Sequence, residues 1–156
     1  MTWKIKIRIA KSKDKRKIKS LAAKYSNLLE WESKRFELLI SLGLNAGFLI
    51  IENSRKEILG FADYGTYKNY SILDNIVIDP KYQGKNFGTI LIYDVLKRIL
   101  LNKELSNNLI TKTKKDNLRM HNSLKKLSFI SNKNNTIWKL TLSEDVLLGI
   151  KSSIKL

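Results

Sequence analysis

The sequence contains no cysteine, one proline and one histidine among its 156 residues. Without cysteine the chain can form neither a disulfide framework nor a thiolate metal site, and it has no cysteine nucleophile. No apolar run approaches the roughly 20 residues that a membrane helix needs. The N-terminal segment alternates basic and apolar residues, unlike a secretory signal. These absences predict a cytoplasmic protein with no membrane partner.

Acidic residues are also scarce. Lys and Arg number 30 against 14 Asp and Glu, which gives a net charge of +16 and a pI near 10.0. Such a basic protein attracts polyanions, and nucleic acid is a candidate partner. The alternative is a compositional bias, because 24 of the basic residues are Lys and they occur along the whole chain. Both interpretations stay open at this point.

Hydrophobic residues make up 43% of the chain and charged residues 28%, which is typical of a globular protein. At this length we expect one domain, residues 1–156, with a substantial core. Strict alternation over residues 3–9 predicts a half-buried strand. Its apolar face would carry Trp3, Ile5, Ile7 and Ile9.

The remaining segments predict two helices and then a sheet with further helices. Ser12 or Asp14 can cap the first helix, whose apolar residues recur at helical spacing: Ile18, Leu21, Ala22 and Tyr25. A second helix is expected over residues 26–43. Later elements are expected at 48–53, 57–65, 70–79, 87–101 (helix), 108–113, 116–129 (helix), 129–131 and 136–142, and the tail is either a turn of helix or an edge segment. This order predicts an α+β domain with a mixed, mostly antiparallel central sheet of six to seven strands, flanked by about four helices.

The stretch DPKYQGKNFG, residues 79–88, holds the only proline and two of the seven glycines, directly before an apolar helical run. A helix start leaves about four backbone N–H groups without partners and carries partial positive charge. Glycines let an anion approach such a backbone closely, which suits a pyrophosphate. Neither the P-loop nor the dinucleotide-binding fingerprint fits these residues.

The segment IVIDPKYQGKNFGTILI resembles the acyl-CoA-binding motif of the GNAT superfamily of N-acetyltransferases, in which a strand is followed by Q/R-x-x-G-x-G/A and a helix. Further along, TKTKKDNLRMHNSLKKLSF resembles the second motif of that family, N-x-x-A-x-x-F-Y-x-x-x-G-F. The two motifs span residues 74–129 in the expected order. The resemblance implies a GNAT-like fold, acetyl-CoA as co-substrate and no metal.

The resemblance also implies which residues hold CoA. Gln83, Gly84 and Gly88 match the pyrophosphate loop, and Asn117 matches the asparagine that contacts the CoA arm. The strand before the loop would place its backbone along the thioester. The expected CoA-binding set is Ile76, Ile78, Gln83, Gly84, Lys85, Asn86, Phe87, Gly88, Thr89 and Asn117.

Three positions depart from the family pattern. Asn86 stands where glycine is preferred, but Asn tolerates a left-handed backbone and is a good N-cap. Ser128 replaces a glycine near a turn. Leu124 falls where the family often has the tyrosine that protonates the departing thiolate. Because a thiol has a pKa near 8.5 and a general acid contributes roughly 10²–10⁴-fold, this loss should slow the reaction without abolishing it.

Two residues are candidates for proton transfer. Asp74, in the strand before the loop, matches the family's general base, which acts directly or through a water. The alternative is a structural carboxylate, since structural ion pairs also perturb carboxylates. His121 shares a helical face with Asn117 and Leu124 and is a candidate proton shuttle. The alternative is an ordinary exposed histidine.

The family's acceptor groove is lined by two regions, which correspond here to the second helix and the turn after residue 63. Glu30 or Glu32 would suit an amine, whereas Trp31 at helical spacing fits a core position. The turn is flanked by three aromatic residues: Tyr64, Tyr67 and Tyr70.

Together these features predict an enzyme, an acyl-CoA-dependent N-acetyltransferase that works as a monomer or homodimer. A primary amine of a small molecule or protein would attack acetyl-CoA directly. Two alternatives stay open. One is an acyltransferase directed to nucleic acid, such as tRNA or a modified base, which the charge motivates. The other is a non-catalytic CoA-binding module, which Leu124 motivates. The acceptor itself does not follow from the sequence, because function lies in sites grafted onto folds.

Overall fold

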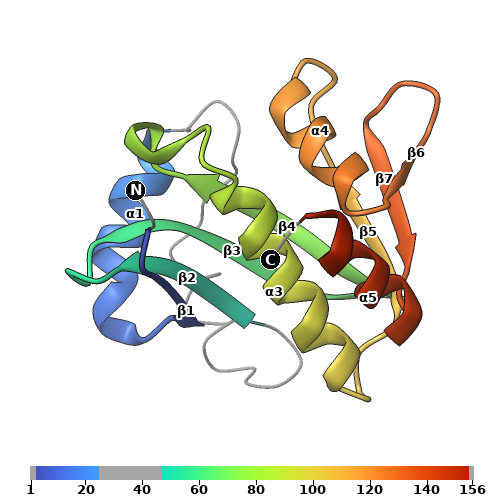
Figure 1. Cartoon of the computed structure of the whole chain (residues 1–156), viewed down its shortest axis with the longest axis horizontal. Helices are drawn as coiled ribbons and strands as arrows, with labels where there is room; N and C mark the ends of the chain where they lie inside the picture. Colours follow the sequence, from blue (N-terminus) through green and yellow to red (C-terminus); the bar gives the residue numbers. More distant parts are fainter. Residues whose placement is uncertain (1–2, 25–46, 155–156) are drawn as a thin grey trace.

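The computed structural model describes residues 3–24 and 47–154, apart from the side chain of Tyr67. Seven strands form one sheet in the order β1-β2-β3-β4-β5-β7-β6 (Figure 1). The strands are β1 (Ile5–Ile9), β2 (Gly47–Asn53), β3 (Ile58–Tyr67), β4 (Tyr70–Ile78), β5 (Asn108–Lys112), β6 (Ile130–Ser131) and β7 (Ile137–Thr141). The helices are α1 (Lys15–Ala23), α3 (Phe87–Leu101), α4 (Leu118–Lys126) and α5 (Glu144–Ser153). In this described part, no helix combines the length and hydrophobicity of a membrane span.

Neighbouring strands are antiparallel except β4 and β5, which run parallel. A parallel pair needs a crossover connection, and α3 supplies it. The predicted α+β class with a mixed, mostly antiparallel sheet is therefore confirmed. The helix expected over residues 87–101 is also confirmed, and the ambiguous tail forms the ten-residue helix α5. The second predicted helix, residues 26–43, lies outside the described residues.

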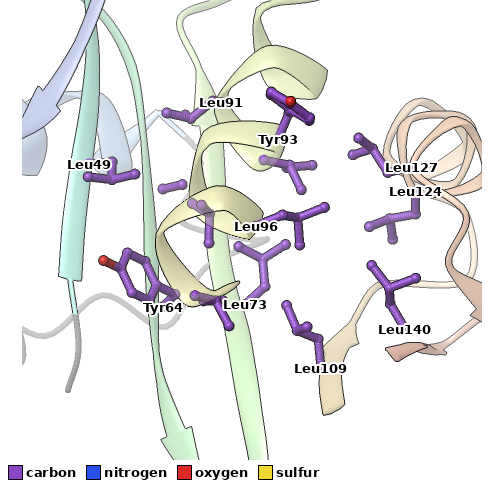
Figure 2. Packing of buried hydrophobic residues seen from close by; sticks show 14 of the residues in the cluster. Leu49, Tyr64, Leu73, Leu91, Tyr93, Leu96, Leu109, Leu124, Leu127 and Leu140 are labelled. Carbon is purple, nitrogen blue, oxygen red and sulfur yellow. The ribbon is translucent and has the colours of Figure 1, made fainter. Parts of the chain in front are cut away.

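Two apolar clusters pack on opposite faces of the sheet. On one face, α1 buries Ile18 and Leu21 against Phe48 and Phe61. On the other face, α3 is surrounded by strand residues, by α4 and by α5. Figure 2 shows Leu96 of α3 between the strands and the leucines of α4. Because both faces are covered, β2 reads as the continuous apolar run GFLII and not as an alternating one.

The first strand departs from its predicted pattern at Ile9. Trp3, Ile5 and Ile7 pack against the core as expected, but Ile9 is 56% exposed, so its predicted place on the buried face is wrong. The physical reason is position: β1 is the outermost strand, and Ile9 forms the last pair of its ladder with Leu49.

Arg8, on the other face of β1, binds two buried carboxylates. Its guanidinium donates to Asp14 at 2.8 and 3.0 Å and to Glu52 at 3.1 Å. Asp14 also accepts the backbone N–H of Lys11 at 2.7 Å. Asp14 stands at the N-cap of α1 without capping it through its side chain, and neither does Ser12, so the predicted cap is wrong. The Arg8 guanidinium, with the Lys11 amide, holds the pKa of Asp14 below its ordinary value despite burial.

Asp14→Asn should therefore remove part of the acid sensitivity of the fold. A depressed carboxyl pKa gives stability that is fully present above the unfolded value near 3.9 and is lost as pH falls through the folded pKa. At pH 7 the free energy of unfolding of the variant should be about 1–3 kcal/mol lower than that of the wild type. This gap between the two proteins should close below about pH 4. Denaturant unfolding between pH 2 and 7 measures it. Asp116→Asn, at an exposed carboxylate, is the control, and a gap that stayed constant with pH would contradict the assignment.

The C-terminus of α4 holds a non-glycine residue in the left-handed region. Ser128 has φ of 66°, its N–H donates to the Lys125 carbonyl at 3.0 Å, and the Phe129 N–H donates to the Leu124 carbonyl at 3.0 Å. Glycine is the residue that adopts this conformation without steric cost. The departure of Ser128 from the family pattern is thus a strained position.

Ser128→Gly should stabilise the protein. Relief of the left-handed strain, about 1–2 kcal/mol, exceeds the entropy that glycine adds to the unfolded chain, about 0.4–1 kcal/mol. We expect a melting temperature higher by roughly 2–4 °C, measured by calorimetry. Ser128→Ala keeps the Cβ and should give no gain; an equal gain from both variants would refute the strain argument.

Candidate active site

Strands β4 and β5 separate soon after they meet. Their parallel ladder covers Ser71–Leu73, opposite Leu109–Thr111. β4 then continues to Ile78, where its end leads into the segment that starts α3. The sheet therefore opens between β4 and β5 on the side where the chain turns into α3.

A β-bulge marks the point where the strands separate. On β3 Ala62 and Tyr64 are two residues apart, but their partners on β4, Ile76 and Leu73, are three apart. Two β4 residues, Asp74 and Asn75, therefore stand opposite Asp63. Such a bulge bends a strand and re-aims its side chains.

Asp63 holds this bulge from within the core. Its side chain is 0% exposed, and it accepts the backbone N–H and the side-chain N–H of Asn75, both at 2.9 Å. The bulge also switches the facing pattern of β4, because Leu73 and Val77 belong to opposite core clusters although they are four residues apart. A buried carboxylate thus sets the geometry at the centre of the opening.

The backbone direction of β4 follows from two hydrogen bonds. The N–H of Asn75 points to Asp63 on β3, and the N–H of Asp79 donates to the Leu59 carbonyl at 2.8 Å. Successive N–H groups of a strand point to opposite edges. The N–H groups of Ile76 and Ile78 therefore point away from β3, toward the opening.

The loop after β4 presents backbone amides. A 3₁₀ turn, Pro80–Tyr82, is capped by Asp79, whose side chain accepts the Lys81 N–H. Burial raises the pKa of Asp79, but the Lys81 amide and the Lys24 ammonium at 3.3 Å outweigh it, so the pKa lies below the ordinary value. Gly84 has φ of 81°.

Asn86 adopts the left-handed conformation that its residue type tolerates, with φ of 63°. It stands at the N-cap of α3, but its side chain makes no capping hydrogen bond, so the predicted capping role is wrong. Within the described residues, the N–H groups of Phe87, Gly88 and Thr89 have no protein acceptor, and the first helical bond comes from Ile90. The start of α3 therefore offers donors that a side chain would otherwise satisfy.

The space in front of these amides is open. Among the residues that the structure describes, a Cβ placed on Gly84 meets no heavy atom within 4 Å, and one on Gly88 meets only the Ile78 side chain at 3.7 Å. Packing within the protein therefore does not require glycine at position 88. Free amides, the helix dipole and open space together suit a pyrophosphate. The backbone amides of an extended strand likewise suit the peptide-like pantetheine arm of CoA.

The N-terminal segment braces this loop. Trp3 packs edge-to-face on Tyr82 and Phe87, with ring centroids 5.8 and 5.9 Å apart. The Lys85 ammonium lies 5.3 Å from the Trp3 ring centroid, a cation–π distance. Phe87 is therefore a core side chain, and only its amide faces the loop.

Helix α4 forms the opposite wall of the opening. Arg119 donates to the Gln83 side-chain oxygen, and the Gln83 nitrogen donates to the Ile78 carbonyl at 3.1 Å. The Thr89 hydroxyl donates to the Ser123 hydroxyl at 3.2 Å. These bonds bring the two predicted motifs together, one from each side of the opening.

The sequence matches the acetyltransferase (GNAT) family over residues 13–129. The chain belongs to this family. The predicted family, its acetyltransferase activity and its use of acetyl-CoA are thereby confirmed at the level of the GNAT family. The sequence matches no curated protein.

Solved structures show the same fold. YncA, a putative acetyltransferase from Salmonella typhimurium with its cofactor acetyl-CoA, has a TM-score of 0.73 at 15% identity and covers 90% of this chain and 95% of its own. Spermidine N-acetyltransferase from Vibrio cholerae, in complex with CoA and spermine, has a TM-score of 0.70 at 15% identity, covering 93% and 98%. Ribosomal-protein-S5-alanine acetyltransferase from Vibrio fischeri has a TM-score of 0.73 at 15% identity, covering 92% and 96%.

Helix α4 carries the residues of the second GNAT motif. The Asn117 side chain accepts the Met120 N–H at 3.3 Å and caps the helix. Leu124 is fully buried in the core cluster and lies on the same side of α3 as Leu96 (Figure 2), so no hydroxyl stands at this position.

His121 is 3% exposed, which rules out the ordinary exposed histidine. Its ring lies against Trp138, with centroids 5.2 Å apart, and its Nε2 is 3.0 Å from both the Thr113 hydroxyl and the Lys114 carbonyl. A carbonyl can only accept, so Nε2 carries a proton. These contacts give His121 a structural place between α4 and β7.

The acceptor-side candidates are only partly described. Asp74 lies at the bulge and is half-buried. Tyr64 is 8% exposed and packs over Gly47, where a Cβ would clash with its ring, so it is a core residue and not a groove residue. Tyr70 is half-buried, with the Lys139 ammonium 5.5 Å from its ring centroid. The side chain of Tyr67, and all of Glu30, Trp31 and Glu32, lie outside the described part.

Two residues of this site were not predicted from the sequence. The sequence does contain a signal for Asp63, because it is a carboxylate inside the apolar strand segment ILGFADYG. It contains no such signal for Arg119, because only the fold brings α4 against the loop.

Across residues 3–24 and 47–154, no group of three His, Cys, Asp or Glu side chains could hold a metal ion.

Gly88→Trp should block the pyrophosphate without disturbing the core. An indole there fills the space in front of the α3 amides, and losing charge-assisted hydrogen bonds should weaken acetyl-CoA binding about 10- to 100-fold. Calorimetric titration measures it. The control is Gly149→Trp on helix α5, where a Cβ would meet no heavy atom of the described residues within 4 Å. Equal weakening by both variants would contradict this site.

Proposed function

We propose that this GNAT protein transfers the acetyl group of acetyl-CoA to a primary amine, within one domain that spans residues 1–156. The observation that carries the proposal is the continuity of the opening beside β4 with the unpartnered amides at the start of α3. An acyl-CoA molecule has matching parts in the same order: a thioester, an arm with two amides and a pyrophosphate.

The CoA-binding residues of the proposal follow this path. The amides of residues 84–89 bind the pyrophosphate, helped by the left-handed backbone at Gly84 and Asn86. Arg119 can give up its hydrogen bond to Gln83 and donate a charged hydrogen bond to the phosphates instead. Asn117 sets the start of α4 as the opposite wall, and the N–H groups of Ile76 and Ile78 face the arm and the thioester.

The acceptor nitrogen attacks the thioester carbonyl carbon in this mechanism. A C–N bond forms, the C–S bond breaks, and CoA leaves as the thiolate. The N–H of Ile76 donates to the carbonyl oxygen as it gains negative charge. Asp74, beside it on the bulge, takes the proton from the amine directly or through a water.

Because position 124 is a leucine, this mechanism uses no tyrosine as a general acid. Its side chain belongs to the core, and a thiolate of pKa near 8.5 can leave near neutral pH without a proton donor. We assign His121 no proton transfer, because its Nε2 is held by Thr113 and Lys114. A non-catalytic CoA-binding module would bind acetyl-CoA and release no thiol with any amine.

The acceptor in this proposal is an amine of a small molecule or of a protein. Two structural neighbours are named for such acceptors, a polyamine and the alanine of a ribosomal protein. At 15% identity, the acceptor of neither neighbour can be assigned to this chain. The panel of amines tested as acceptors should therefore include spermine and peptides with a free N-terminus.

Asp74→Asn should separate catalysis from binding. If Asp74 is the base, thiol release from acetyl-CoA with the best amine of the panel should fall roughly 10²–10⁴-fold at neutral pH, while the acetyl-CoA Kd stays unchanged. Asp94→Asn, a carboxylate paired with Lys97 and Arg98 on α3, is the control. Full activity of Asp74→Asn would assign Asp74 the structural role instead.

A further inference from the structure

The positive charge of this protein is concentrated at one place. Residues 4–24 contain ten of the 30 basic residues and one acid, so the even spread expected from the sequence does not hold for this segment. Eight of these cations are exposed, and one of them, Lys24, pairs with Asp79. The other seven lie directly before or on β1, on the following turn or on α1. We call them the N-terminal basic surface: Lys4, Lys6, Lys11, Lys13, Arg16, Lys17 and Lys19.

The nearby carboxylates do not neutralise this surface. Asp14 and Glu52 are 5% and 7% exposed, and both are bound by Arg8 inside the protein. Within the described residues, none of the seven cations forms a salt bridge. The surface therefore presents its full charge to solvent.

The arrangement of these cations opposes the stability of α1. The first turn of α1 has no acid and begins with Lys15, Arg16 and Lys17, where the helix dipole favours negative charge. Arg16 and Lys19 are both exposed on α1 and three residues apart, where like charges are neighbours on the helix surface and repel. An anionic partner would relieve both costs, whereas a compositional bias alone gives no reason to gather cations there.

The cations form one face. Across the β1–β2 ladder, Lys6 pairs with Glu52 and Arg8 pairs with Ile50, which packs in the cluster under α1. The basic side of β1 and the outer side of α1 are thus on the same side of the sheet, joined by the Arg8–Asp14 ion pair. Within residues 3–24 the only aromatic side chain is Trp3, which packs on Tyr82 and Phe87.

We propose that the N-terminal basic surface binds the phosphate backbone of a double-helical nucleic acid. Clustered exposed cations neutralise phosphates and release counterions, which needs no base contacts. Single-strand binding proteins add aromatic platforms for base stacking, and this surface offers none. The inference goes beyond acetyl transfer and does not depend on it.

The test compares two variants of equal net charge in the full chain. Lys13, Arg16, Lys17 and Lys19 are replaced by Gln in the surface variant. In the control variant the exposed residues Arg55, Lys103, Lys133 and Lys151 are replaced by Gln. Fluorescence anisotropy measures binding of labelled 20-bp RNA and DNA duplexes and a 20-nucleotide single strand, at several salt concentrations, with anionic vesicles as a further arm.

We expect duplex binding that falls steeply with salt. The surface variant should bind about 100-fold more weakly near 0.1 M salt, with a salt slope smaller by roughly one for each phosphate that no longer meets a cation. The control variant should keep most of its affinity. The surface variant should also melt at an equal or higher temperature, because its repulsions are gone, and should keep its affinity for acetyl-CoA, which shows that it is folded.

Three results would overturn the proposal. Equal weakening in both variants would mean that net charge alone attracts nucleic acid. Absence of wild-type binding at low salt would remove the interaction. Binding to vesicles or single strands in preference to both duplexes would assign the surface to another partner.

Discussion

The short ladder between β4 and β5 is the constraint on which the site depends. A sheet interior normally satisfies each backbone N–H with a neighbouring strand. Here the parallel ladder stops at Leu73, while β4 runs on to Ile78 and carries the chain into α3. A strand edge and a helix start therefore lie along one continuous path in the candidate site.

The opening is kept in shape by contacts between protein groups from distant parts of the chain. Asp63 holds the bulge through Asn75, α4 is tied to the loop through Arg119 and Gln83, and Trp3 supports the loop from the N-terminal side. These three supports come from different parts of the chain. Of these residues, Asp63 and Trp3 act on the opening only through other protein groups, whereas Gln83 and Arg119 also belong to the proposed CoA-binding set.

Charge has two separate roles in this fold. Arg8 joins β1, β2 and α1 by binding Asp14 and Glu52 inside the protein, where hydrogen-bonded charges hold elements together. The seven cations of the N-terminal basic surface face solvent, and those of them at the start of α1 cost helix stability. The internal network also removes the acids that would otherwise balance the outer surface, so the two roles are linked.

Across the described residues, the sequence by itself determined the order of the strands, the limits of α3 and the loop that begins it, because these depend on local chemistry. Period-two and helical patterns, Pro80 and the glycines act over a few residues. The two family motifs likewise pointed to the candidate site, since their spacing is contained in the chain. The exposure of Ile9, the burial of His121 and the failure of Asn86 to cap were not accessible this way.

Only the tertiary structure decided which groups meet across the opening. The pairing of Arg119 with Gln83 joins residues far apart in the chain, and the bulge beside Asp63 exists only when β3 and β4 are in register. The placing of Arg8 between two acids likewise needs β1, β2 and α1 together. Local sequence sets what a segment can form, whereas contacts between distant segments depend on the packing of the whole sheet and its helices.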